Sequence, residues 1–167
     1  MKKMILSALA LTFFALPSLL AQKYFTKEGH ISFFSEAPVE KIEAHNHKAV
    51  SVMDAATGAM EFAVLIKAFQ FEKALMQEHF NENYMESDKF PKAKFQGSIT
   101  NMGSVDLNKD GVYPVKVAGE LTIHGISQPV ESEGKIAVKD GNIRAEAAFE
   151  VAVADYEIEI PAVVRDN

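Results

Sequence analysis

The chain has 167 residues and a formal net charge of −6 at pH 7, with 17 Lys and Arg against 23 Asp and Glu. This length fits one domain with a sizeable core, and the acidic balance argues against nucleic acid or an anionic membrane surface as a partner. Because the sequence contains no cysteine, disulfides, thiolate metal sites and a thiol nucleophile are excluded.

The first 21 residues have the pattern of a secretory signal peptide. Lys2 and Lys3 give a positive start, and an apolar run follows from Met4 to Leu16. This run is shorter than the ~20 apolar residues that a membrane-spanning helix needs, so we expect export without stable membrane insertion. Residues 22–167 then form a single domain in the periplasm or the extracellular space.

After this leader, apolar and polar residues alternate in most segments, which is the pattern of antiparallel strands with one solvated face. Strands are predicted weakly over residues 30–36, 39–48 and 49–54, and strongly over 92–100, 112–125 and 142–160. The pairs Asp110-Gly111 and Asp140-Gly141 stand between alternating segments and indicate hairpins. We expect about seven or eight strands, arranged as a barrel or a sandwich.

Residues 71–90 change to helical spacing. Leu75, Met76 and Phe80 recur on one apolar stripe, and Pro91 ends the segment. We expect one amphipathic helix whose stripe lies across one end of the barrel and admits a ligand. The alternative is a helix that only plugs the barrel.

Sequence signatures of catalysis are missing, since there is neither a G-x-S-x-G elbow nor a phosphate-binding glycine loop. His45 and His47 share one face of a predicted strand, a spacing that can hold a metal. A metal site needs three or four ligands, and His30, His79 and nearby acids are the candidates to complete it. We expect no catalytic residue, no metal and no cofactor. The alternative is a metal-binding or hydrolytic envelope protein that uses His45, His47 and nearby carboxylates.

Two motifs suggest a family. One is Phe-Pro-x-Ala-x-Phe-x-Gly from Phe90 to Gly97, and the other is Gly-x-Leu-Thr-Ile-His-Gly from Gly119 to Gly125. With the final ADYEIEIP segment, they resemble the YceI-like family of exported, lipocalin-like proteins associated with polyisoprenoid lipids. The resemblance covers essentially all of residues 22–167.

The resemblance implies a mostly all-β fold: an antiparallel lipocalin-like β-barrel of about eight strands with one amphipathic helix over an end. It also implies an elongated apolar lumen that holds a lipid tail. Relatives usually continue past the equivalent of Val163-Val164 with another strand, whereas this sequence stops at Asn167. We therefore expect the domain to lack the family's last strand, and to be a monomer or a weak homodimer that pairs through the open edge.

A barrel of about eight strands either fills its interior with side chains or holds one small ligand. Burying ~10 CH₂ groups gains on the order of 8 kcal/mol at about 0.8 each, which exceeds association costs of roughly 4 kcal/mol. We therefore predict a non-enzymatic protein that binds, carries or sequesters an isoprenoid-type or other long apolar lipid in the cell envelope. The predicted lumen residues are Phe62, Val64, Ile66, Phe69, Phe71, Leu75, Met76, Phe80, Phe95, Ile99, Val115, Val117, Leu121, Ile123, Phe149 and Val151.

Overall fold

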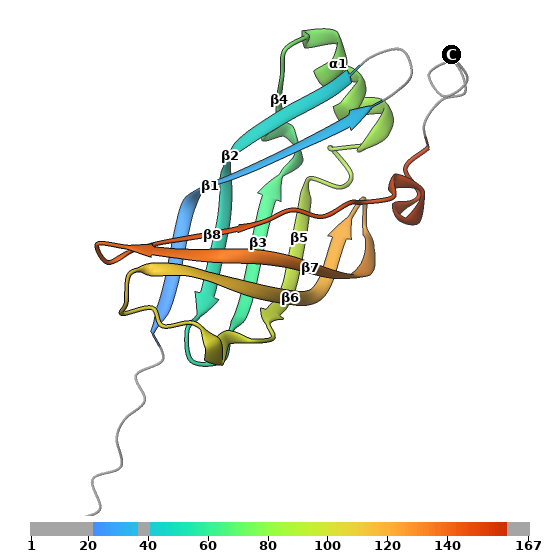
Figure 1. Ribbon diagram of the computed structural model, residues 1–167. Helices are drawn as coiled ribbons and strands as arrows, with labels where there is room; N and C mark the ends of the chain where they lie inside the picture. Colours follow the sequence, from blue (N-terminus) through green and yellow to red (C-terminus); the bar gives the residue numbers. More distant parts are fainter. Residues whose placement is uncertain (1–21, 37–40, 160–167) are drawn as a thin grey trace, which may run out of the picture.

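The computed structural model describes residues 22–36 and 41–159. The predicted signal peptide lies outside these residues. Within the described residues, eight strands form a single antiparallel sheet (Figure 1). They are β1 (Lys23–Glu36), β2 (Lys41–Asp54), β3 (Ala59–Leu65), β4 (Gln70–Phe71), β5 (Lys92–Ile99), β6 (Gly111–Ile123), β7 (Ile126–Lys139) and β8 (Asn142–Ala147). Short 3₁₀ turns follow as η1 (Ile66–Ala68), η3 (Met102–Ser104) and η4 (Val153–Tyr156). The prediction of an antiparallel, lipocalin-like fold is confirmed.

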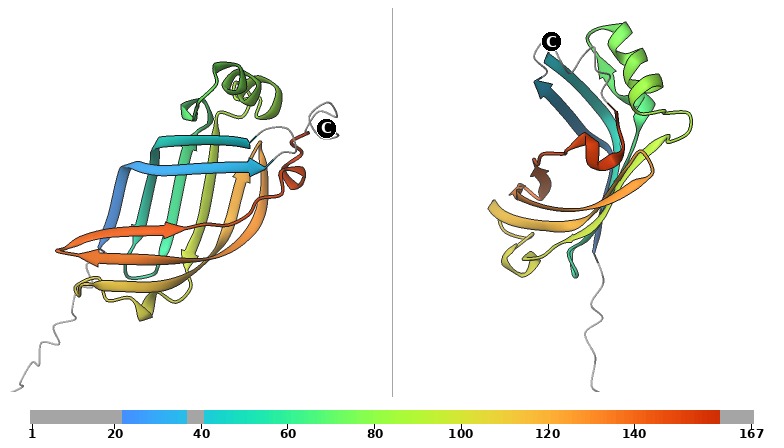
Figure 2. Two further views of the ribbon diagram at one scale, coloured as in Figure 1. Left: turned by 45° about the horizontal axis from the view of Figure 1, so that its top comes forward. Right: turned by 90° about the vertical axis from the view of Figure 1, so that its right-hand side faces the viewer.

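The sheet curves into a half-barrel, with strand order β1-β2-β3-β5-β6-β7-β8 and with β4 paired to β2 (Figure 2). In the described part of the chain, β1 pairs with β2 alone and β8 with β7 alone. These two strands are therefore the edges of the sheet, and the side between them is not closed by hydrogen bonds among the described residues.

The strand β2 corrects one prediction, because residues 39–48 and 49–54 were expected to be separate strands and 41–54 is continuous. Asn46 and Ala49 are both buried, while His47 and Lys48 between them are exposed. The Asn46 side chain fixes this irregularity, since its Oδ1 accepts the N–H of Lys48 at 2.9 Å and its Nδ2 donates to the Leu65 carbonyl at 3.0 Å. Such a bulge shifts the alternation by one residue, so the sequence reads as two strands.

Three further boundaries differ from the prediction. The first strand begins at Lys23, earlier than expected. The expected strand over 142–160 ends at Ala147, and the chain turns into η4 before Glu157, which has a φ of +52°. β7 extends back to Ile126, but its described pairing with β8 stops at the Gly134–Ala147 pair. Past this point, side-chain hydrogen bonds from Ser132 and Gln128 of β7 to the carbonyl oxygens of Ala148 and Asp155 take the place of a described backbone ladder. Asp140-Gly141 forms the predicted tight hairpin, whereas Asp110 ends a longer loop between β5 and β6.

The predicted helix consists of α1 (Ala74–His79) and a π-helical turn, η2 (Phe80–Tyr84), at one end of the sheet (Figure 1). The expectation that Leu75 faces the barrel is wrong, since this side chain is 63% exposed. Leu75 and Phe80 are five residues apart, which is about 140° around a helix of 3.6 residues per turn. Phe80 and Tyr84 pack against the core instead.

The core covers the concave face of the half-barrel as two clusters of buried residues. The cluster at the helix end is built around Val64, Phe95 and Leu121. The second cluster, toward the other end, is built around Ile99, Val115 and Ile136. The three named residues of the first cluster come from β3, β5 and β6, and those of the second come from β5, β6 and β7. Within each strand the inward residues alternate with solvated ones.

Candidate functional site

The concave face holds most of the predicted lumen residues. Those that are buried are Val64, Ile66, Phe69, Phe95, Ile99, Val115 and Leu121, and those partly buried against the clusters are Phe62, Phe71, Phe80, Val117 and Ile123. Met76 is partly buried, while Leu75, Phe149 and Val151 are exposed. The alternation of β3, β5 and β6 thus places their inward residues on one surface, whereas the segment after Ala147 does not follow it.

Four phenylalanines from distant parts of the chain meet at the helix end of this surface. The Phe80 ring lies 4.9 Å from Phe71, 5.5 Å from Phe33 and 5.8 Å from Phe69, measured between centroids. Phe33 belongs to β1 and Phe71 to β4, so the helix is attached to both through Phe80. Sequence reasoning missed Phe33, because β1 has a shifted register between Thr26 and Ile31 that disturbs its alternation.

A glycine pair forms the floor of the concave face between β5 and β6. Gly97 lies opposite Gly119, and the Phe95 ring folds over both. A Cβ on Gly119 would meet Phe95 Cζ at 2.7 Å and Gly97 Cα at 2.6 Å. Phe95 also stacks on Phe62, with centroids 5.1 Å apart. The glycines of the two sequence motifs are therefore one structural unit that lets an aromatic ring lie flat on the sheet.

The two core clusters are continuous with each other. Met60 of β3 and Val117 of β6 are partly buried and pack against both clusters. An apolar surface therefore runs along the concave face from the helix end to the opposite end, and Val117 lies at its middle.

His124 fastens three segments at the helix end. Its Nε2 lies 2.9 Å from Glu86 Oε2 in the loop after η2, and its Nδ1 lies 3.2 Å from the carbonyl oxygen of Tyr156 in η4. Tyr156 and Ile158 are buried in the cluster at that end. Burial raises the pKa of the Tyr156 hydroxyl, and the neighbouring Asp155 charge adds to this effect. Tyr156 and Ile158 therefore fill part of the concave face, which strand alternation alone did not predict.

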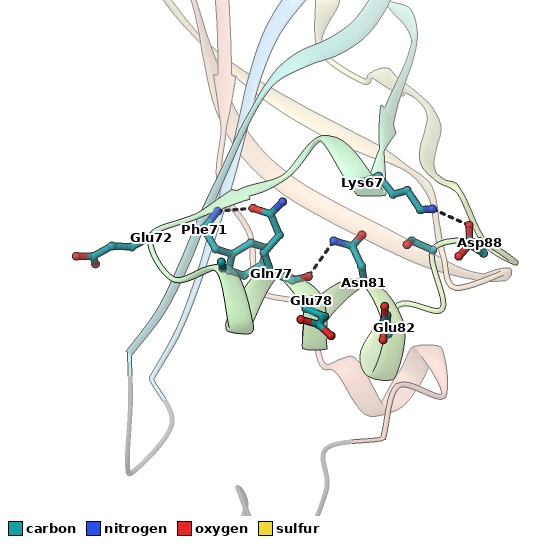
Figure 3. A pocket seen from close by; sticks show the side chains of 10 residues that line it. Lys67, Phe71, Glu72, Gln77, Glu78, Asn81, Glu82 and Asp88 are labelled. Atoms are coloured by element: carbon teal, nitrogen blue, oxygen red, sulfur yellow. Dashed lines mark hydrogen bonds and ion pairs between the residues drawn. The ribbon is translucent and has the colours of Figure 1, made fainter.

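A polar groove of about 520 Å³ runs beside α1 (Figure 3). It is lined by Lys67, Phe71, Glu72, Ala74, Gln77, Glu78, Asn81, Glu82, Ser87 and Asp88. Lys67 Nζ is paired with Asp88 Oδ1 at 2.6 Å, and Asn81 Nδ2 donates to the Gln77 carbonyl at 2.9 Å. Of the predicted lumen residues, Phe71 alone lines this groove. Carboxylates and amides make up most of the other lining side chains, so the groove does not suit an apolar chain.

Three histidines gather on the outer face of β1 and β2. The His30 ring lies 4.4 Å from His47 and 5.4 Å from His45, in both cases nearly parallel. Loss of hydration lowers the pKa of the His30 imidazole, and the positive charges that His47, His45 and Arg144 can carry lower it further. The predicted pair is thus joined by His30, while His79 lies on α1. As these side chains lie, no three His, Asp or Glu groups of residues 22–36 and 41–159 are arranged to hold a metal ion.

No helix in the described part of the chain is both long and apolar enough to span a bilayer.

Comparison with known proteins gives one family and several similar folds. The model of the YceI-like domain matches residues 24–167. A solved polyisoprenoid-binding domain from Saccharophagus degradans, implicated in plant cell wall breakdown, aligns with a TM-score of 0.70 and 11% identity over 83% of this chain and 82% of that one. BcnA of Burkholderia cenocepacia aligns with a TM-score of 0.53 and 12% identity over 85% and 76%. None of the curated proteins matches the chain.

Proposed function

Because the chain belongs to the YceI-like family, we propose that it is a non-enzymatic protein that binds, carries or sequesters an isoprenoid-type or other long apolar lipid. The observation that carries this proposal is the continuous apolar surface along the concave face, with Met60 and Val117 linking its two clusters. The polyisoprenoid-binding description of the Saccharophagus degradans domain supports the choice of lipid class. The signal-peptide pattern of residues 1–21 supports a place in the cell envelope, in the periplasm or outside the cell.

The bound tail lies along the middle of the half-barrel, over Val117 and between the two clusters. Burying ~10 CH₂ groups there gains on the order of 8 kcal/mol, against roughly 4 kcal/mol or more for association. No directed polar contact is needed for this affinity, which fits a surface of Phe, Val, Ile and Leu. The same reasoning places the tail away from the polar groove beside α1.

The first test is native mass spectrometry of the chain purified without detergent, where a co-purifying hydrophobic mass is expected. The second compares two variants of one strand. Val117→Phe fills the middle of the concave face, whereas Val112→Phe adds the same group at a side chain that is 67% exposed. We expect Val117→Phe to lose retention of a fluorescent isoprenoid probe and Val112→Phe to keep it. Equal retention by two folded variants would contradict a tail over Val117.

A further inference from the structure

The three histidines on the outer face of β1 and β2 differ in chemical character from the apolar concave face, and the proposed lipid function does not use them. We propose that His30, His45 and His47 form a binding site for a divalent transition metal, with Zn²⁺ as the ion to test. His45 and His47 are alternate residues of β2, and His30 belongs to the paired strand β1. Alternate positions on one strand plus a position on its neighbour bring three imidazoles to one face of a sheet.

One pair of nitrogens is already close enough to share an ion, and the two nearly parallel rings must turn for both lone pairs to point at it. His30 Nε2 lies 3.2 Å from His45 Nδ1. Two imidazole nitrogens bound to one tetrahedral zinc ion at 2.0–2.1 Å are about 3.3 Å apart. The hydrogen bond between these nitrogens holds one proton, which His30 Nε2 carries when His45 Nδ1 accepts. Metal binding at His30 Nε2 releases this proton to solvent while Nδ1 of the same ring takes one up, so His30 remains a neutral imidazole ligand.

Glu43 orients His45 for this role. Its Oε1 lies 3.1 Å from His45 Nε2, and a carboxylate accepts a hydrogen bond only from a protonated nitrogen. The Nε2 proton leaves the lone pair on Nδ1, which faces His30. A carboxylate behind a metal-bound imidazole fixes its ring and raises its basicity, and removing such a partner typically weakens metal binding about 10–100-fold.

The third ligand needs one movement. The His47 ring is stacked on His30, so its nitrogens do not point toward the His30–His45 pair. His30 and His47 are both exposed, so a change of rotamer meets no packed core. With His47 turned, three imidazoles and one water complete a tetrahedral site at the surface.

Zinc titration by calorimetry tests the site, using the chain without a histidine tag and after chelator treatment. We expect one Zn²⁺ per chain, with affinity lowered at least 10-fold in each of His30→Ala, His45→Ala and His47→Ala, and lowered about 10-fold in Glu43→Gln. His79→Ala, which removes an exposed imidazole from α1, is the matched control and keeps the wild-type affinity.

Circular dichroism melting checks that every variant is folded, which is expected because the altered side chains lie on the outer face. Absence of stoichiometric Zn²⁺ binding by the wild type overturns the proposal. So does a folded His30→Ala/His47→Ala variant that binds as tightly as the wild type. Lipid retention by all these variants is expected to stay at the wild-type level, so failure of the metal site is distinguishable from failure of the lipid proposal.

Discussion

Replacing Gly119 with Ala tests the packing on which the concave face depends. The new methyl group would stand 2.7 Å from Phe95 Cζ and 2.6 Å from Gly97 Cα, and the second contact is with backbone that cannot rotate away. Overpacking of this kind costs typically 1–3 kcal/mol. Displacing the Phe95 ring also loses its stacking on Phe62, which is worth about 0.5–1.5 kcal/mol. Lower chain entropy of alanine in the unfolded state offsets about 0.4–1 kcal/mol, so the net loss is about 0.5–4 kcal/mol.

Urea unfolding followed by circular dichroism measures this loss as a lower midpoint at an unchanged slope. Gly103→Ala is the control, because a Cβ at Gly103 meets nothing within 4 Å, and its stability should stay within about 0.5 kcal/mol of the wild type. Equal midpoints for the two alanine variants would show that Phe95 can pack on this sheet without a glycine beneath it. The two sequence motifs would then need a different structural explanation.

Three other predictions concern the helix, the buried Tyr156 and the turn at Asp54. Phe80→Ala should lower the free energy of unfolding by about 2–3 kcal/mol, below the 3–5 of a fully buried site, while the exposed Leu75→Ala stays within about 0.5 in the same urea assay; equal losses would contradict the placement of the helix. Because burial raises the pKa of Tyr156, stability should fall as pH rises above about 10, where the unfolded chain loses the proton first. Tyr156→Phe should flatten this alkaline loss in melting curves, and an unchanged slope would oppose it. The Thr57 and Ala56 N–H groups lower the pKa of Asp54, so the stability it contributes is present above about pH 4 and lost below it. Asp54→Asn should reduce this acid dependence, and an identical acid profile would count against the turn.

The strong period-two segments over 92–100 and 112–125 predicted β5 and β6, because those strands have one face on the core and one in solvent. The same rule failed for the segment after Ala147 although β7 continues to Ile126, because alternation records a preference for strand but not whether the backbone pairs with the neighbouring edge. It also divided β2, where the Asn46 side chain supports a bulge that no propensity signals. The helix was found from its spacing, yet its inward side was misplaced at Leu75, because Leu75 and Phe80 lie about 140° apart around the helix and cannot face the core together.

The candidate site was predictable in part for similar reasons. Inward residues such as Val117 follow from alternation along one strand. The joining of His30 to His45 and His47 depends on the register between β1 and β2, which no local pattern specifies. The contribution of Tyr156 to the core depends on a long-range contact through His124.

The division of the concave face into two clusters has a consequence for local unfolding of the sheet. Met60 and Val117 bridge clusters that otherwise draw on different ends of the same strands. Backbone amides near Leu121 and those near Ile136 should therefore exchange with deuterium as two cooperative units with different protection. A bound apolar chain that contacts both clusters would make the two groups of amides open together. Slower exchange, with the same protection in both groups, would therefore indicate a bound lipid without identifying it.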